Sequence, residues 1–207
     1  MEIGRDKMED THNNTICYEA HGNLYLNITN RCSADCTFCV RNFQTGVYGY
    51  DLRLSRDPSL EEIIAELEKH DISEYGEIVF TGFGEPTLRF EVLLKITGWL
   101  KSKEAYIRLD TNGHAQLINP ENDVIENLKD AGLDAVSVSL NAESKEKYDR
   151  ICKPAYPDAY QAMLDFTKNA RNAGIDTRMT VVRIPEIDID KCREIATSIR
   201  ADFHVRG

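Results

Sequence analysis

Short apolar runs alternate with longer amphipathic runs along most of this 207-residue chain. The short runs are rich in β-branched residues, a composition that favours strands. They are Asn23 to Ile28, Glu77 to Thr81, Ala105 to Asp110, Asp134 to Leu140, Thr177 to Arg183 and Asp202 to Val205. Another run, Thr15 to Glu19, is followed by Ala20, His21 and Gly22, which predicts a strand that forms a hairpin with the first of the six.

Amphipathic runs with helical spacing separate most of these strands. In the clearest one, Ser59 to His70, the apolar side chains form one stripe, and Ser59 and Glu62 have the spacing of a capping box. The others lie near Phe90 to Lys103, Asn122 to Ala131, Pro157 to Ala173 and Asp188 to Arg200. Gly132 and Gly174 each follow a helical run, where a left-handed residue commonly ends a helix.

Strands separated by helices pair in parallel through right-handed crossovers, so the pattern predicts an α/β fold, either a doubly wound sheet or a barrel. Six units are fewer than the eight of a closed barrel, which leaves room for a partial, open barrel. We expect residues 1–207 to form a single domain, with 1–13 loose and 22–206 in the partial barrel. The long connection from Val40 to Pro58 is expected to fold over the functional site.

Composition and charge narrow the classes of function. Hydrophobic residues make up 42% and charged residues 29% of the chain, as in ordinary globular proteins. No window approaches the length of an apolar membrane span, and the first residues carry charges where a signal peptide needs an apolar core. We therefore expect a cytoplasmic protein with no membrane contact. The formal net charge of -10 counts against nucleic acid as a direct ligand.

Three of the six cysteines, Cys32, Cys36 and Cys39, directly follow the first parallel strand. Loops at the carboxyl ends of strands carry the active sites of β/α folds. Thiolates at this spacing can hold a soft metal centre, and three ligands for four irons leave one iron open. The alternatives are zinc, which wants a fourth ligand, incidental cysteines, or an electron-transfer centre that recruits Cys17 or Cys152.

The triplet, with the aromatic Phe38 just before its last cysteine, resembles the signature of the radical S-adenosylmethionine (SAM) superfamily. The resemblance implies a partial (β/α)6 barrel, a [4Fe-4S] cluster on Cys32, Cys36 and Cys39, and SAM chelated to the open iron with Phe38 near its adenine. It also implies flavodoxin or ferredoxin as the electron donor. Reductive cleavage of SAM would then give a 5'-deoxyadenosyl radical that abstracts hydrogen from a substrate, which the sequence does not name.

Later strand ends supply the other expected contacts to SAM. The run from Thr81 to Pro86 resembles the family's Gly-Gly-Glu segment with Phe83 interposed, and its carboxylate is expected to accept from the SAM ammonium. A Thr-Asn-Gly segment follows the third strand, polar side chains alternate along the fourth, and the fifth resembles the strand that packs on adenine. The predicted cofactor-binding residues are Phe38, Gly82, Gly84, Glu85, Asp110, Thr111, Asn112, Ser139, Asn141, Val182 and Arg183.

These segments also have purely structural interpretations. Asn112 and Gly113 form a standard turn signal, and Ser139 and Asn141 can bond to each other and to water.

Either Arg178 or Arg183 could hold a carboxylate bidentately, but strand parity lets only one of them face inward. A surface salt bridge is the alternative for both. The isolated residues His114 and His204 predict no role.

The run from Gly22 to Arg31 resembles the short TatD-associated group of radical SAM proteins, which implies a TatD-type hydrolase as a functional neighbour. The sequence stops after the sixth strand, so a large substrate such as a protein, or a partner that closes the barrel, is expected. A glycyl-radical activase and a 7-carboxy-7-deazaguanine synthase-like enzyme are alternatives within the enzymes. Outside the enzymes, the alternative is a non-catalytic iron-sulfur binding or electron-transfer module.

Overall fold

The computed structural model describes residues 14–207, and the segment expected to be loose, 1–13, lies outside the described residues. Strand β1 (Cys17–Ala20) pairs antiparallel with β2 (Asn23–Asn27). The turn between them uses His21 and Gly22, both with positive φ, as a two-residue hairpin requires. The predicted N-terminal hairpin is therefore confirmed.

The other strands of the main sheet are parallel and follow one another in chain order. They are β5 (Ile78–Thr81), β6 (Ile107–Thr111), β7 (Ala135–Ser139), β8 (Asp176–Val182) and β9 (Asp202–Arg206), giving the order β1-β2-β5-β6-β7-β8-β9. A doubly wound sheet would reverse its strand order at one point, so this unidirectional order selects the barrel-like alternative. Within residues 14–207, no ladder joins β9 to β1 or β2.

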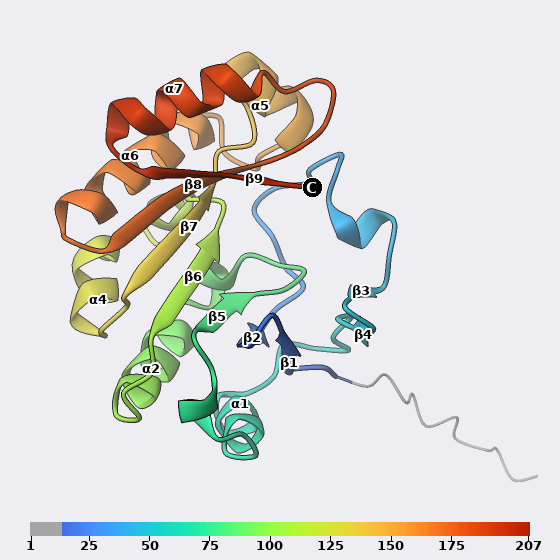
Figure 1. Cartoon of the computed structure of the whole chain (residues 1–207), viewed down its shortest axis with the longest axis vertical. Coiled ribbons are helices and arrows are strands. Elements are labelled where there is room, and N and C mark those ends of the chain that lie inside the picture. Colours follow the sequence, from blue (N-terminus) through green and yellow to red (C-terminus); the bar gives the residue numbers. More distant parts are fainter. Residues whose placement is uncertain (1–13) are drawn as a thin grey trace, which may run out of the picture.

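Helices cover the outer face of the curved sheet (Figure 1). They are α1 (Leu60–Leu67), α2 (Phe90–Lys101), α3 (Ala115–Ile118), α4 (Val124–Asp130), α5 (Lys145–Cys152), α6 (Ala159–Asn172) and α7 (Ile189–Ile199), with 3-10 turns η1 (Val40–Asn42), η2 (Ile72–Glu74) and η3 (Pro86–Arg89). The predicted capping box begins α1: Ser59 Oγ accepts from the Glu62 amide at 3.2 Å, and the Glu62 carboxylate accepts from the Ser59 amide at 2.7 Å. Among the described residues, no helix is long and apolar enough to cross a membrane.

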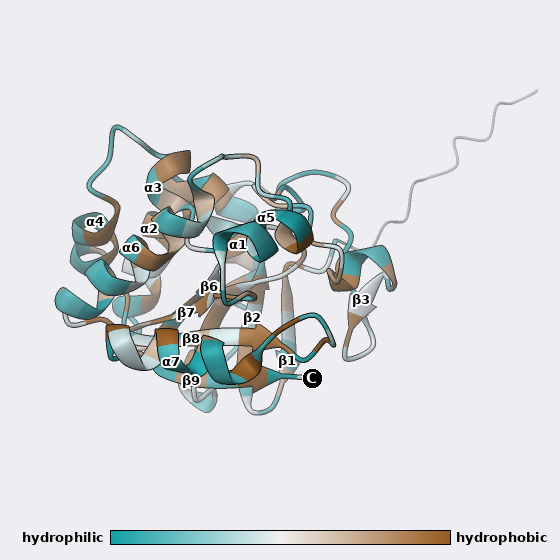
Figure 2. Ribbon diagram, turned by 90° about the horizontal axis from the view of Figure 1, so that it is seen from above, coloured by the Kyte–Doolittle hydropathy of each residue, from teal (hydrophilic) through white to brown (hydrophobic). Residues whose placement is uncertain are grey.

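Alternation along the strands separates an apolar outer face from a polar inner face. On β6, the buried Ile107 and Leu109 join the core under the helices, whereas Arg108 and Asp110 point to the inside of the barrel. The helices carry teal, hydrophilic stretches alternating with brown, hydrophobic ones (Figure 2), as expected of elements with one face on a sheet and the other in water. The inner face is therefore left free for ligands.

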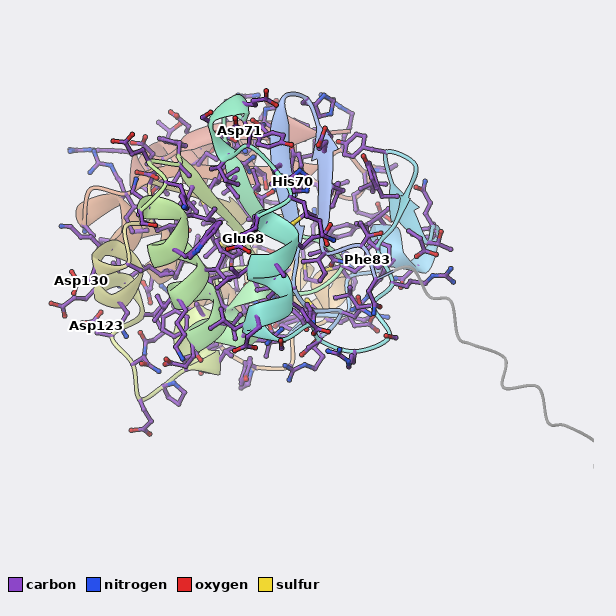
Figure 3. All side chains as sticks on the ribbon, turned by 90° about the horizontal axis from the view of Figure 1, so that it is seen from below. Glu68, His70, Asp71, Phe83, Asp123 and Asp130 are labelled. Carbon is purple, nitrogen blue, oxygen red and sulfur yellow. The ribbon has the colours of Figure 1, made fainter. Side chains whose placement is uncertain are left out.

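The Val40 to Pro58 connection forms η1 and a small hairpin of β3 (Gly46–Val47) and β4 (Tyr50–Asp51). The connection is tied to the barrel by the side-chain amide of Asn27, whose Nδ2 donates to the Leu52 carbonyl at 2.8 Å. Leu52 packs with Tyr18 and Phe83, and Phe83 lies on the side of the molecule that carries this hairpin (Figure 3). Of the whole connection, Val40 lines the cavity described below, so the segment flanks the site more than it covers it.

Candidate active site

A cavity of about 350 Å³ lies at the carboxyl ends of the parallel strands. These ends meet along one edge of the sheet, so residues far apart in the chain line one space. The lining residues are Cys32, Ala34, Cys36, Phe38, Cys39, Val40, Gly82, Phe83, Gly84, Glu85, Asp110, Thr111, Asn112, Ser139, Asn141, Val182 and Arg206. The structure thus brings together the three cysteines and every predicted cofactor-binding residue except Arg183.

Arg183 is exposed because it follows the inward-facing Val182 by one residue, and successive strand side chains point to opposite faces. Its amide donates to the Arg206 carbonyl at 2.8 Å, while its side chain is absent from the described cavity lining. Arg206, on β9, provides the guanidinium of the cavity instead. Arg178 also faces inward, four residues below Val182 on β8, as parity requires.

The cysteine loop is shaped by backbone hydrogen bonds to the end of α5. The Asp35 amide donates to the Cys152 carbonyl at 3.1 Å, and the Thr37 amide donates to the Ile151 carbonyl at 2.8 Å. In return, the amide of Ala155 donates to the carbonyl of Ser33 at 2.9 Å. Three bonds of this kind fix the course of the loop between the first and last cysteines.

The thiols of the loop occupy different electrostatic environments. Burial raises the pKa of Cys32 to about 12, and the neighbouring Glu85 carboxylate acts in the same direction. The Cys152 thiol donates a hydrogen bond that lowers the pKa of Cys36, with Arg41 adding to the effect, and the pKa of Cys152 is raised by the same bond. Cys152, which the sequence left as a distant candidate, therefore lies against the triplet.

The donor set fits a [4Fe-4S] cluster. Three thiols from one loop line the same cavity, and each thiolate of such a cluster binds a different iron, so the sulfurs need not converge on one ion. Among the described residues, no three His, Cys, Asp or Glu side chains form a site for a single metal ion.

Glu85 is buried, with 2% of its surface exposed, and both of its carboxylate oxygens are engaged. Oε1 accepts from the hydroxyls of Thr87 and Thr111, each at 2.8 Å, and Oε2 accepts from the Asn112 amide at 2.7 Å. Burial raises the pKa of Glu85, whereas these hydrogen bonds oppose the rise. A carboxylate has about four acceptor sites, so Oε2 keeps one for a cationic ligand in the cavity.

Asn112 connects the third strand end to the cysteine loop. Its side-chain Nδ2 donates to Ser33 Oγ at 2.8 Å and lies 3.9 Å from Cys32 Sγ. Ser33 Oγ is 3.0 Å from His114 Nδ1, and His114 Nε2 is 2.7 Å from the Tyr148 hydroxyl. Burial lowers the pKa of His114 to about 4, so the imidazole is neutral at neutral pH.

Two glycines allow the loop after β5 to approach the cysteine loop. A Cβ on Gly84 would lie 2.4 Å from the carbonyl oxygens of Thr29 and Arg31. Gly82 has a φ of +114°, and its Cβ would lie 2.2 Å from Asn27 Oδ1. The two glycines of the segment that resembles Gly-Gly-Glu are therefore needed for the packing of the loop after β5 against the chain around the cysteine loop, apart from any contact with a ligand.

Ser139 and Asn141 point into the cavity from the end of β7. The Asn141 side chain hydrogen-bonds the Cys152 thiol, and Asn141 itself has a φ of 54°. The structure therefore pairs the Asn141 side chain with Cys152.

The radical SAM superfamily profile matches residues 26–199. The chain belongs to the radical SAM superfamily, whose members are enzymes that use a [4Fe-4S] cluster and SAM. The short TatD-associated group is not confirmed by this match.

The sequence is also similar to curated proteins. Over 130 residues, 63% of this chain and 40% of the relative, the sequence is 35% identical to a probable GTP 3',8-cyclase of Methanocaldococcus jannaschii. An uncharacterized protein of the same organism is 33% identical over 126 residues, which are 59% of this chain and 35% of that protein. The chain therefore spans well under half of these relatives.

The fold resembles that of Streptococcus suis SuiB bound to SAM, with a TM-score of 0.66 and 16% identity over 87% of this chain and 39% of SuiB.

Proposed function

We propose that Cys32, Cys36 and Cys39 hold the [4Fe-4S] cluster of this radical SAM enzyme and that the adjoining cavity takes SAM. The observation that carries this proposal is the 350 Å³ cavity itself, which the three thiols share with the glycine-glutamate, Thr-Asn-Gly and serine-asparagine segments. When bound, the cluster supplies the electron that cleaves SAM to methionine and a 5'-deoxyadenosyl radical, which abstracts hydrogen from substrate.

The chain's residues orient SAM. Glu85 Oε2 accepts from its ammonium, and Ser139 and Asn141 bond its ribose or carboxylate. Phe38 and Val182 supply apolar surface for its adenine. Glu85 is already held by Thr87, Thr111 and the Asn112 amide, so it meets the ligand in a fixed position.

The test is anaerobic cluster reconstitution followed by dithionite and SAM, with 5'-deoxyadenosine measured by chromatography. We expect 5'-deoxyadenosine and methionine in equal amounts, and a change in the EPR spectrum of the reduced cluster on adding SAM. Cys36→Ala is expected to abolish cluster assembly. Cys192→Ala is the matched control, because Cys192 is buried in α7 under the helix layer.

The alternative of an electron-transfer module predicts a fourth protein ligand, and Cys152 is the cysteine placed to provide it. Loss of the cluster in Cys152→Ala, with no 5'-deoxyadenosine from the parent protein, would favour that alternative. Retention of the cluster and of SAM cleavage in Cys152→Ala would favour the enzyme.

The proposal extends to the partners and the setting of the enzyme. We propose flavodoxin or ferredoxin as the electron donor, a cytoplasmic location, one domain over the chain, and membership of the TatD-associated group, the last on the Gly22 to Arg31 run. The relatives' name makes GTP the first substrate to test, with a protein as the second. Mixing the reconstituted enzyme with GTP and SAM and measuring GTP-dependent 5'-deoxyadenosine would decide between them.

A further inference from the structure

Two of the three cysteines of the triplet receive a hydrogen bond from a side chain of a distant segment. Asn112, at the end of β6, directs its Nδ2 at Cys32 Sγ across 3.9 Å, and sulfur is a weak acceptor for such a donor. Cys152, at the end of α5, donates its thiol hydrogen to Cys36. The proposed function uses neither side chain, so both contacts need a reason of their own.

The side-chain amide of Asn112 is held from both ends. One hydrogen of Nδ2 goes to Ser33 Oγ at 2.8 Å, which leaves the other for Cys32 Sγ. Its Oδ1 accepts from the His114 backbone amide at 3.0 Å. A backbone N–H can only donate, so this bond also fixes which end of the amide is the nitrogen. Nδ2 therefore stays directed at the cysteine loop and has no hydrogen left for SAM.

Cys152 is equally constrained. It is buried, with 1% of its surface exposed, and it is absent from the described cavity lining. The Asn141 side chain hydrogen-bonds its sulfur, and its own hydrogen goes to Cys36. Its carbonyl accepts from the Asp35 amide at 3.1 Å, which holds the end of α5 against the cysteine loop. Cys152 therefore contacts Cys36 without reaching the space proposed for SAM.

Cluster assembly would fix the direction of both bonds. A thiolate bound to iron carries no hydrogen, so Cys32 and Cys36 can only accept once they are cluster ligands. Asn112 Nδ2 can only donate, and Cys152 is the partner that still carries a proton. One donor thus meets each of two thiolates. Reduction adds an electron to the cluster, and such donors stabilise the form with more negative charge on its sulfurs.

We propose that Asn112 and Cys152 are positioning residues that act on the cluster through Cys32 and Cys36 and raise its reduction potential. The inference rests on the proposed function, because it takes the three cysteines as the cluster ligands. Hydrogen bonds to the sulfurs are among the factors that set the potential of an iron-sulfur cluster. Both donors come from outside the cysteine loop, so the fold as a whole, and not the triplet alone, sets how readily the cluster accepts an electron.

The test is an anaerobic redox titration of the reconstituted protein without SAM, followed by the EPR signal of the reduced cluster. Cys152→Ala and Asn112→Ala each remove one donor, so each should make reduction less favourable, by about tenfold in the equilibrium constant. For a one-electron couple, that change is a midpoint potential about 59 mV more negative. Cys152→Ser keeps a hydroxyl donor and should restore part of the shift.

Cys192→Ala is the matched control, because Cys192 is a buried cysteine of α7 that is absent from the described cavity lining. Its midpoint potential should equal that of the parent protein. Cys152→Val fills the buried space without a donor and should shift the midpoint as Cys152→Ala does, so the test stands even if the alanine variant does not fold. Thermal unfolding of the cluster-free proteins shows which variants are folded.

Three outcomes would overturn the proposal: a folded Cys152→Ala protein that binds no cluster, which would make Cys152 a ligand; a midpoint equal to the parent's in Cys152→Ala or Asn112→Ala; or an equal shift in Cys192→Ala. Formation of 5'-deoxyadenosine by the parent protein is the separate readout for the proposed function. Its absence, with both predicted shifts present, would reject SAM cleavage at this cavity and leave the role of the two donors standing.

Discussion

The Nδ1 atom of His114 lies 3.0 Å from the Oγ atom of Ser33, the residue that follows the first cysteine of the triplet. The other ring nitrogen is 2.7 Å from the Tyr148 hydroxyl. A neutral imidazole has one donor and one acceptor, and hydroxyls can meet either. The neutral histidine therefore joins the cysteine loop to α5, donating to one hydroxyl and accepting from the other.

This geometry predicts how stability depends on pH. His114 has its pKa lowered from 6.5 to about 4, so below about pH 6.5 the unfolded chain binds a proton that the folded chain does not. The free energy of unfolding should therefore decrease as the pH is lowered through this window. His114 should account for roughly 2 kcal/mol of the decrease by about pH 5. Urea unfolding of cluster-free protein at about pH 7 and pH 5 measures the difference.

His114→Gln keeps a donor and an acceptor at this place but does not titrate in the window. Its unfolding free energy should therefore lose that part of the pH dependence. An equal dependence in parent and variant would contradict the burial of a neutral histidine.

Two glycine substitutions should act in opposite directions. Gly84→Ala places a methyl group 2.4 Å from two backbone oxygens, and overpacking of this kind costs about 1–3 kcal/mol. A Cβ added at Gly98, in the interior of α2, would meet no atom within 4 Å, and Gly98→Ala should stabilise by about 0.5–1 kcal/mol through helix propensity. Denaturant unfolding of both variants checks the signs, and a stable Gly84→Ala protein would count against the close loop contact.

Glu85→Gln should weaken SAM binding. The amide replaces one acceptor oxygen with a donor, which opposes the hydroxyls of Thr87 and Thr111 and removes the charge facing the ammonium. We expect the Kd for SAM to rise about tenfold or more in the cluster-loaded protein. Calorimetric titration measures it, with the exposed Glu91→Gln on α2 as the control that should bind SAM normally.

The two arginines at the end of the sheet should differ in the same titration. Arg206 lines the cavity and Arg183 does not, so Arg206→Gln should raise the Kd for SAM while Arg183→Gln leaves it unchanged. Equal effects would mean that the strand parity of β8 differs from the one described. The two variants therefore test the one difference between the predicted cofactor-binding residues and the cavity lining, which is that Arg206 lines the cavity and Arg183 does not.

Local patterns predicted much of this fold. The parallel strands lie within two residues of the runs that predicted them. Such runs can be found because apolar strand residues and the residues that end a strand are neighbours in the sequence. The capping box at Ser59 and the hairpin turn at His21 and Gly22 are equally local. The cysteine triplet was found because its three members share one loop.

Features that depend on contacts between distant segments were missed. Helix α5 buries only Tyr148, Ile151 and Cys152 of its eight residues, too short a stripe to be detected by periodicity. His114 gained a role only when folding placed Ser33 on one side of it and Tyr148 on the other. Strand parity allowed one of Arg178 and Arg183 to face inward, but it could not show that Arg206 on β9 provides the guanidinium of the cavity.

The support of the cysteine loop by α5 also constrains the order of events during synthesis. The amides of Asp35 and Thr37 find their acceptors on residues 152 and 151, more than a hundred residues later in translation. A nascent chain that has been synthesised only as far as its cysteines lacks the backbone acceptors of α5 that shape their loop. Iron delivery is therefore expected to follow completion of α5, which makes the metallocentre a late, post-folding addition and keeps free iron from directing the early collapse of the chain.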